Sequence, residues 1–306
     1  MESRAHNYAI KSSPTANDHT STKRCTTGML IFVGICLLLI ILGLGLGLGL
    51  RLGLRSSSSI STCDTATAKC GCPSISPNIT SRIVNGNIAT SNSWPWMVAI
   101  YMSNGRLCGG TLVTYEHVLT AAHCVSDVTS IDVVVYAGIQ KLSERFNGQV
   151  RNVSVITVHS EYSDTNKTND LAILKLSSPI IPSATTSLCC LPTMSSKPSI
   201  GDTAIYIGWG RTSPSSGFSD ELRQSVTRVV DSSLCYYAPI TDNQICTGNT
   251  TSIACYGESG SPLMININNA WACVGVVNMG LLTCDSYVVF TRVAHYTSFI
   301  SNATST

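Results

Sequence analysis

The sequence predicts an all-β fold for most of the chain, and three observations support this. From Ile83 onward, short runs rich in Val, Ile, Leu and Tyr alternate with Gly, Ser, Asn and Pro, the pattern of many short strands in a sandwich or barrel. The chain has 306 residues, and single all-β units of about 200–250 residues are common. Its 14 cysteines are mostly spread along the chain, which is typical of disulfides formed in an oxidising compartment.

Ten runs are expected to be strands, and a helix is expected near the end of the chain. Each run has the length and composition of a short strand and is bounded by turn residues. The expected strands are Met97–Met102, Thr111–Leu119, Ile131–Tyr136, Val150–Val158, Ala172–Leu176, Thr203–Ile207, Val226–Val230, Pro262–Ile267, Ala272–Val277 and Tyr287–Thr291. The expected helix is Ala294–Ile300.

The chain before Ile83 divides into three segments. Residues 1–28 are polar and have no hydrophobic period, which predicts a disordered tail. Residues 29–50 form an uncharged apolar run that is long enough to cross a bilayer as one helix. A cleaved signal peptide has a shorter apolar core nearer the N-terminus, so an uncleaved anchor is favoured, with a secreted protein as the alternative. Residues 51–82 are expected to be a stalk.

Cysteines and glycosylation sequons predict the orientation of this span. Lysine and arginine are balanced on its two sides, so the positive-inside rule does not decide. Most cysteines and all five Asn-x-Ser/Thr sequons follow the span, and both mark the side outside the cytosol. We therefore expect a single-pass type II plasma-membrane protein with a cytoplasmic tail. The expected glycosylation sites are Asn78, Asn152, Asn166, Asn249 and Asn302.

The composition argues against two classes of partner. The net charge is only +2, with 12% charged residues, so nothing indicates a nucleic-acid partner. The cysteines and histidines show no spacing that forms a zinc ligand set. We therefore expect no metal and no cofactor.

A serine between two glycines is the first sign of chemistry. Ser259 lies in the stretch Gly257–Leu263, where glycine permits a sharp turn and a close approach of a substrate backbone. Two peptide N–H groups in such a turn can converge on a developing oxyanion. The same Gly-x-Ser-x-Gly pattern also fits an α/β-hydrolase elbow or a chance turn, so this stretch alone does not decide.

Three further stretches add a base, an acid and a cleavage point. Leu119–Cys124 places His123 between small residues and a cysteine. Asn169–Leu174 places Asp170 at the head of an apolar run. Arg82–Gly86 puts a basic residue at the junction between the stalk and the β region.

Together these stretches resemble the chymotrypsin-like (trypsin-fold) serine proteases. The order His, Asp, Ser matches this family and differs from subtilisins and α/β-hydrolases, and the resemblance covers about residues 83–301. Four other stretches fit it as well: Trp94–Trp96, Cys108–Leu112, Gly208–Gly210 and Phe290–Val293. The resemblance implies a protease domain at 83–306 with two six-stranded antiparallel β-barrels, the active site between them and a short C-terminal helix.

The resemblance also implies the catalytic roles and the substrate. Ser259 would be the nucleophile, His123 its general base and Asp170 the carboxylate that orients the imidazole. The N–H groups of Gly257 and Ser259 would form the oxyanion hole. The substrates would be polypeptides.

Activation is implied at the bond between Arg82 and Ile83. In the family, the new N-terminus pairs with the carboxylate just before the nucleophile, which here is Glu258 in place of the usual aspartate. Ser261 likewise stands in place of a usual glycine. These departures and a narrowed primary pocket motivate the alternative of a catalytically weak or inactive binding domain, with a cell-surface adhesion domain as a third interpretation.

The primary pocket is expected to be apolar and short. By family position, Ile253 lies at its base, Val288 replaces a glycine of its wall and Gly280 keeps its neck open. A buried isoleucine gives a cationic side chain no partner, so we expect cleavage after small or medium apolar residues. The protein would then need a trypsin-like protease to cut after Arg82. Asn278 and Met279 replace the usual Ser-Trp beside the substrate.

Disulfides are implied by family position. One family bridge is missing at both ends, where Ala204 and Ile265 stand. Cys189 could form a disulfide with a second cysteine of the stalk, and Cys63 and Cys273 stay unassigned. The implied bonds are Cys108–Cys124, Cys235–Cys246, Cys255–Cys284, and a tether from Cys190 to Cys70 or Cys72.

Overall fold

The computed structural model describes residues 63, 68–79, 86–211, 216–235, 240–248, 258–280 and 287–305. All of them belong to one compact unit, residues 60–306. The predicted tail at 1–28 and span at 29–50 lie outside the described residues, as does most of the stalk. Among the described residues, no helix has both the length and the apolar character needed to cross a membrane.

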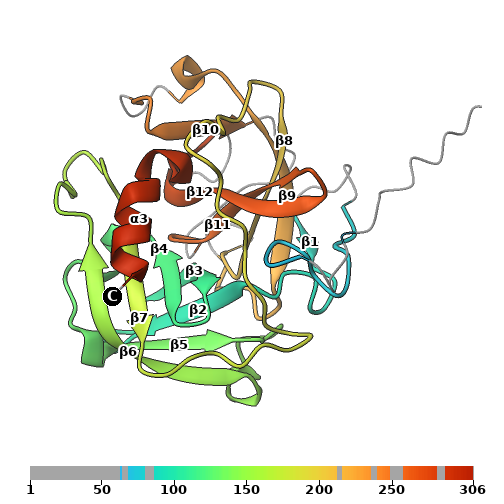
Figure 1. Ribbon diagram of the computed structural model, residues 1–306, viewed down its shortest axis with the longest axis vertical. Coiled ribbons are helices and arrows are strands. Elements are labelled where there is room, and N and C mark those ends of the chain that lie inside the picture. The colour runs from blue at the N-terminus through green and yellow to red at the C-terminus, as the bar shows by residue number, and fades with distance from the viewer. Residues whose placement is uncertain are drawn as a thin grey trace, which may run out of the picture. The chain divides into compact units, whose positions relative to one another are not determined.

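Six antiparallel strands close into the first barrel, which occupies the lower half of Figure 1. The barrel order is β2-β3-β4-β7-β6-β5. The strands are β2 (Met97–Met102), β3 (Leu107–Thr114), β4 (His117–Thr120), β5 (Val133–Ala137), β6 (Gln149–Val158) and β7 (Ala172–Leu176). A short helix, α2 (Ala122–Val125), follows β4.

The other six long strands close in the same way, because β8 pairs with both β9 and β11. The short β1 (Asn87–Ile88) adds to β9, and the chain ends in α3 (Thr297–Thr304). The strands are β8 (Thr203–Gly208), β9 (Arg223–Val229), β10 (Gln244–Gly248), β11 (Pro262–Ile267), β12 (Ala270–Gly280) and β13 (Val288–Arg292). The expected pair of six-stranded antiparallel barrels with a C-terminal helix is therefore confirmed.

Several expected boundaries were wrong. The expected strand Thr111–Leu119 is two strands, because the chain turns at Tyr115–Glu116 between β3 and β4. The expected strand from Ile131 begins at Val133, because Ser130–Asp132 form a 3-10 turn closed by a capping box from Thr129.

Two elements of the second barrel and the C-terminal helix also differ from expectation. Strand β10 was not expected, since its sequence Gln-Ile-Cys-Thr-Gly has little apolar content. The expected helix from Ala294 begins as a 3-10 turn at Val293–Tyr296 and becomes α-helical only at Thr297.

One apolar core links the two barrels. Its largest side chains in the first barrel include Trp96, Leu112 and Leu119, all fully buried. The same cluster contains Ile205 and Met264 from the second barrel. The two barrels therefore bury a shared face, which holds the residues at their junction in place.

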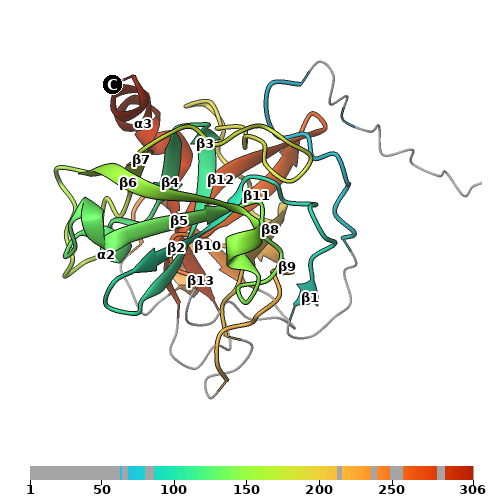
Figure 2. The same cartoon turned by 90° about the horizontal axis from the view of Figure 1, so that it is seen from below.

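The stalk segment 68–79 docks on the outside of the unit, on the side where β1 lies (Figures 1 and 2). Cys70 is bonded to Cys190. Gly71 donates from its N–H to Leu188 O at 2.8 Å, and its carbonyl accepts from Trp271 N at 2.8 Å. These contacts insert the stalk between the linker that joins the barrels and strand β12.

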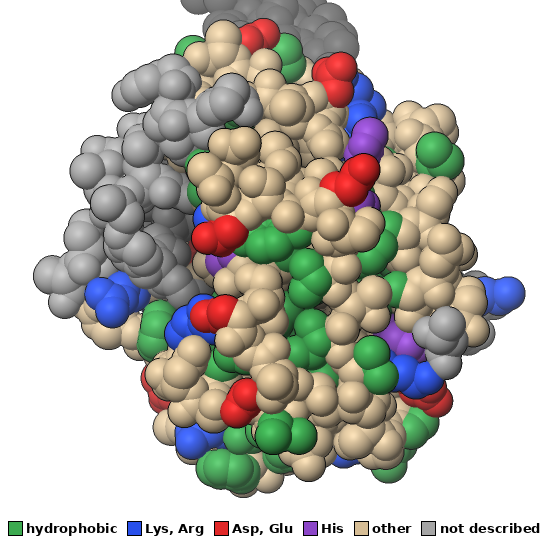
Figure 3. Space-filling model, turned by 90° about the vertical axis from the view of Figure 1, so that its left-hand side faces the viewer, with side chains coloured by type: hydrophobic (Ala, Val, Ile, Leu, Met, Phe, Trp, Pro, Cys, Tyr) green, Lys and Arg blue, Asp and Glu red, His purple; other side chains and the backbone are tan. Residues whose placement is uncertain are grey.

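On the face shown in Figure 3, acidic and basic side chains are scattered among one another and form no large patch of one sign. This matches the small net charge of +2. Such a face has no extended field that would attract a polyanion.

Candidate active site

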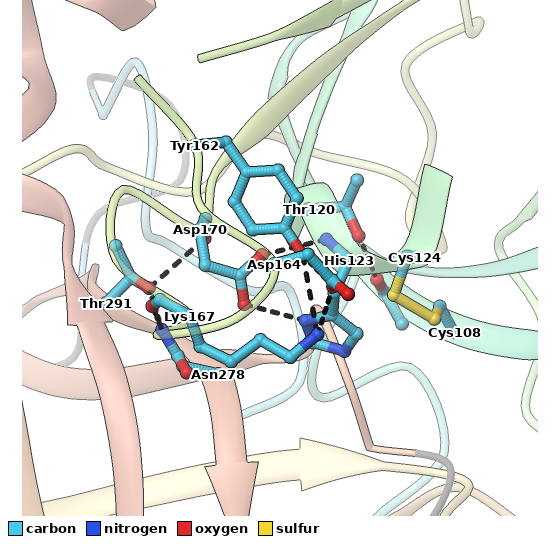
Figure 4. Close-up of polar contacts among 11 residues, drawn as sticks. Cys108, Thr120, His123, Cys124, Tyr162, Asp164, Lys167, Asp170, Asn278 and Thr291 are labelled. Atoms are coloured by element: carbon cyan, nitrogen blue, oxygen red, sulfur yellow. Dashed lines mark hydrogen bonds and ion pairs between the residues drawn. A yellow bond between two sulfur atoms is a disulfide. The ribbon is translucent and has the colours of Figure 1, made fainter. Parts of the chain in front are cut away.

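A histidine and a buried aspartate meet at one end of the first barrel. Strands β4 and β7 are paired, with Thr120 opposite Ala172, so the residues just after β4 and just before β7 come together. His123 lies in α2, and Asp170 precedes β7 and is fully buried. His123 Nδ1 lies 2.6 Å from Asp170 Oδ2, and the His123 backbone N–H donates to Oδ1 at 2.8 Å (Figure 4).

This geometry fixes the imidazole. A buried carboxylate accepts hydrogen bonds, so Nδ1 carries the proton and Nε2 is left as the basic nitrogen. The second bond, to the backbone, prevents Asp170 from rotating away. The disulfide between Cys108 and Cys124 joins β3 to α2 one residue beyond His123. The disulfide therefore fixes the backbone of α2 beside His123, and the hydrogen bond to Asp170 fixes the imidazole ring.

The second barrel supports the aspartate from behind. Thr291 Oγ1 on β13 donates to Asp170 O at 3.1 Å. Asn278 Nδ2 on β12 donates to Thr291 Oγ1 at 3.0 Å and to Lys167 O at 2.7 Å. The Asn278 amide orientation is unambiguous, because Lys167 O can only accept. Sequence reasoning noted Asn278 as a substitution but gave no reason to place its amide in this network.

Three residues of the loop before Asp170 form a second cluster that sequence reasoning missed. Tyr162 donates from its hydroxyl to Asp164 at 2.7 Å, and Lys167 forms an ion pair with Asp164. Figure 4 shows these side chains beside the His123 ring. Burial raises the pKa of Tyr162 well above its usual value, so its hydroxyl stays protonated. No motif marks these residues, because they lie in a loop whose path depends on tertiary contacts.

Ser259 reaches the same site from the second barrel. It lines a cavity of about 520 Å³ together with His123, Cys108 and Phe218. Its carbonyl accepts from Gly109 N at 2.8 Å, which ties the serine turn to β3 of the first barrel. The structure thus brings His123, Asp170 and Ser259 to one place from three separated stretches of sequence.

The glycine after the serine is required by both conformation and space. Gly260 has φ +77°, which L side chains rarely adopt. A Cβ atom there would lie 2.2 Å from Thr120 Oγ1 and 2.5 Å from Gly109 O. The turn therefore presses against the first barrel, which is why the serine lies at the junction.

Glu258 is buried beside the same turn. Only 6% of the residue is exposed, and within the described part of the chain its Oε2 atom has no hydrogen-bond partner. Its side chain packs against Gly210, where an added Cβ atom would lie only 2.2 Å from Glu258 Cγ, so only glycine fits there. Burial raises the pKa of Glu258 from 4.5 to about 8, against the opposing charge of Arg223. Arg223 in turn donates to Gly86 O at 2.8 Å, so the chain just after the predicted activation bond passes close to Arg223.

Two of the three expected pocket residues are neighbours. Gly280 and Val288 pair across β12 and β13, and Val288 is 8% exposed. The third, Ile253, lies outside the described residues. So do Gly257 of the expected oxyanion hole and both residues of the activation bond, Arg82 and Ile83.

The remaining expected residues are placed as follows. The bonds Cys235–Cys246 and Cys70–Cys190 are present in the structure, and Cys72 pairs with the previously unassigned Cys63. The expected pair Cys255–Cys284 and the sequon at Asn249 lie outside the described residues. The other four sequon asparagines are exposed: Asn78, Asn152, Asn166 and Asn302.

A two-barrel fold in which a histidine paired with a buried aspartate shares a cavity with a glycine-flanked serine is the arrangement of a serine-class hydrolase. Comparison with known proteins is more specific. The trypsin family matches residues 83–300. Chymotrypsin-C of Mus musculus is 35% identical over 251 residues, covering 76% of this chain and 92% of the relative. Chymotrypsin-C of Bos taurus is 32% identical over 249 residues, covering 76% and 93%. The chain belongs to the trypsin family and is a serine endopeptidase.

Proposed function

We propose that His123, Asp170 and Ser259 form the catalytic triad of a membrane-anchored endopeptidase that is made as a zymogen. The observation that carries the proposal is the 2.6 Å contact between His123 Nδ1 and Asp170 Oδ2, at the edge of the cavity that Ser259 also lines. A serine hydroxyl is a weak nucleophile until a base removes its proton. The fixed imidazole supplies that base.

In the proposed reaction each residue of the triad has one role. Ser259 Oγ gives its proton to His123 Nε2 and attacks the carbonyl carbon of the scissile bond. Asp170 stabilises the imidazolium that forms. The N–H groups of Gly257 and Ser259 would bind the oxyanion. The imidazolium then protonates the leaving amine, and water hydrolyses the acyl-enzyme by the same route in reverse.

Labelling with an active-site fluorophosphonate tests the triad. Protein cut after Arg82 should be labelled at Ser259, whereas Ser259→Ala should not be labelled at all. His123→Ala should label at least about 100-fold more slowly, because loss of the base removes general-base assistance. Thr193→Ala, an exposed hydroxyl variant, is the control. Absence of labelling in fully cut wild type would favour the binding-domain alternative.

We propose that the primary pocket accepts small or medium apolar side chains. Val288 lies opposite Gly280 across β12 and β13, where its side chain would narrow the pocket, and Ile253 would offer a cation no charge at the base. A desolvated arginine or lysine without a partner is costly. A peptide library should therefore show cleavage after residues such as alanine, valine or leucine. A strong preference for arginine or lysine would refute this assignment, and Val288→Gly should shift the preference towards larger side chains.

We propose that a second, trypsin-like protease activates the chain by cutting between Arg82 and Ile83. The apolar pocket excludes arginine, so the enzyme should not cut its own activation bond. The new Ile83 ammonium would pair with Glu258, whose buried Oε2 lacks a partner in the described residues. Purified zymogen should stay uncut for hours and become active when trypsin is added. Self-activation that accelerates with its own concentration would contradict this.

We propose that residues 29–50 anchor the protein in the plasma membrane with the protease domain outside, and that the Cys70–Cys190 bond keeps the cut domain attached. Cells carrying the cut enzyme should release the domain only after a reductant is added. Cys70→Ser should release it without reductant. Release of the wild-type domain on a non-reducing gel would refute the tether, and a fully secreted chain would refute the anchor.

A further inference from the structure

Two cysteines outside the four described disulfides lie together at the junction of the barrels. Cys189 is in the linker between β7 and β8, and Cys273 is in β12. Their residues are 2% and 0% exposed. The backbones around them are joined, since Cys273 N donates to Cys190 O at 2.9 Å and Cys190 N donates to Trp271 O at 3.2 Å.

The two thiols are buried against the same methionine. Cys189 Sγ lies 3.9 Å from Met264 Sδ, and Cys273 is the residue opposite Met264 across β11 and β12. Each thiol donates to a backbone carbonyl, Cys189 Sγ to Cys190 O at 3.3 Å and Cys273 Sγ to Gly275 O at 3.4 Å. Burial, followed by the contact with Cys273, raises the pKa of the Cys189 thiol well above its usual value. A thiol that resists ionisation is a poor nucleophile and a poor metal ligand. These properties argue against a reactive-cysteine role and leave a structural one.

The neighbourhood lacks a disulfide that is usual in the family, as the sequence indicates. Ile205 pairs with Met264 across β8 and β11, so the antiparallel register sets Ala204 beside Ile265. These are the two positions where the family bridge is missing. Met264, which contacts Cys189, is next in sequence to Ile265. The spare pair of cysteines therefore lies within one strand position of the lost bridge.

We propose that Cys189 and Cys273 form a disulfide in the mature protein, replacing the missing bridge by another route. In the oxidation, the two thiols lose two protons and two electrons and a sulfur–sulfur bond forms. An oxidised disulfide oxidoreductase takes up both electrons and both protons, and its own disulfide becomes two thiols. The bond forms during folding, while the thiols are still accessible, because burial slows thiolate formation afterwards.

This bond would connect the barrels through the linker. Cys189 N donates to Leu112 O at 3.0 Å, which pins the linker to β3 of the first barrel. The disulfide would attach the same residue to β12, and β12 carries Asn278 of the Asp170 network five residues further on. The linker that leaves the barrel carrying His123 would thus be bonded covalently to a strand of the barrel carrying Ser259.

Peptide mapping of secreted or cell-surface full-length protein tests the proposal. The protein is denatured without reductant in the presence of an alkylating agent, digested and analysed by mass spectrometry. We expect unalkylated Cys189 and Cys273 in one linked fragment. In Cys273→Ser, Cys189 should become alkylated in full. Cys70→Ser is the matched control, because it should expose Cys190 and leave the proposed bond intact.

Stability provides a second readout. Cys189→Ser and Cys273→Ser should each lower the Tm by roughly 5–15 °C, and the double variant should lower it no further, since either change removes the same bond. Quantitative alkylation of both cysteines in wild type would overturn the proposal. Linkage of Cys189 to a stalk cysteine would overturn it as well.

Discussion

Replacing Glu258 by Gln in the uncut chain should remove a pH-dependent loss of stability. The glutamate is buried, packs against Gly210 and has an Oε2 atom without a partner in the part of the chain that the structure describes. Its pKa is about 8 in the folded chain and 4.5 in the reference state. Gln has nearly the shape of the protonated acid and does not titrate, so it isolates the effect of charge.

The sign and size follow from linkage. Below pH 4.5 both states are protonated, and Glu258 contributes no pH dependence. Between pH 4.5 and 8 the unfolded chain loses the proton and the folded chain keeps it, so stability falls as pH rises, and above pH 8 the loss is complete. One pKa unit corresponds to about 1.4 kcal/mol. The free energy of unfolding should therefore fall by about 3.5 kcal/mol between pH 5 and pH 8 because of this one group.

Urea unfolding of the uncut Ser259→Ala chain at both pH values measures this. The free energy of unfolding of the Glu258→Gln chain, relative to the chain with Glu258, should be about 3.5 kcal/mol more favourable at pH 8 than at pH 5. Glu161→Gln, an exposed carboxylate, should change neither value. Cutting after Arg82 should abolish the difference, since an ammonium partner would stabilise the ionised form. An equal effect of Glu258→Gln at pH 5 and pH 8 would show that the buried carboxyl does not hold its proton.

Two further changes test the supports of the site. Gly71→Ala should destabilise the unit by about 2 kcal/mol in thermal unfolding, because its Cβ would lie 2.4 Å from Trp271 O. Gly201→Ala, which also has positive φ but open space around it, should cost less than half as much, and equal costs would refute the clash. Asn278→Ala should lower kcat by about 10- to 100-fold with little change in KM, since it loosens Asp170 without touching a small substrate. A changed KM with unchanged kcat in steady-state assays would contradict that role.

The strand pattern predicted an all-β fold, and the family resemblance supplied the pair of six-stranded barrels that the structure confirms. The sequence also singled out His123, Asp170 and Ser259, whose catalytic roles stay predictions. Strand patterning depends on local alternation, and the motifs around His123, Asp170 and Ser259 are each contiguous. The expected single strand Thr111–Leu119 was wrong, because the turn at Tyr115–Glu116 carries none of the glycine, proline or asparagine residues that usually mark a turn. In that stretch, the local pattern cannot show where the chain reverses.

Other features could not be predicted, because they depend on contacts between distant segments. Cys63 pairs with Cys72 rather than with a cysteine of the protease domain, and sequence spacing does not encode that choice. The contact of Cys189 with Cys273 likewise exists only once the linker lies on β12. The Asn278 amide finds its partners across 111 residues of sequence to Lys167. Such pairings follow from the assembled barrels and not from any local signal.

The two departures from the family pattern are accommodated by neighbouring glycines. A Cβ atom at Gly109 would lie only 2.0 Å from Ser261 Oγ, so the glycine leaves room for the serine side chain. Gly210 leaves room for Glu258 in the same way. The backbone of the turn keeps its own bonds, with Ser261 N donating to Glu258 O at 2.8 Å and Val277 N to Ser261 O at 2.9 Å. The larger side chains therefore change what packs behind the turn and leave the turn itself formed. Glu258 and Ser261 therefore give no structural reason to prefer a domain that only binds, because the backbone hydrogen bonds of the turn are kept.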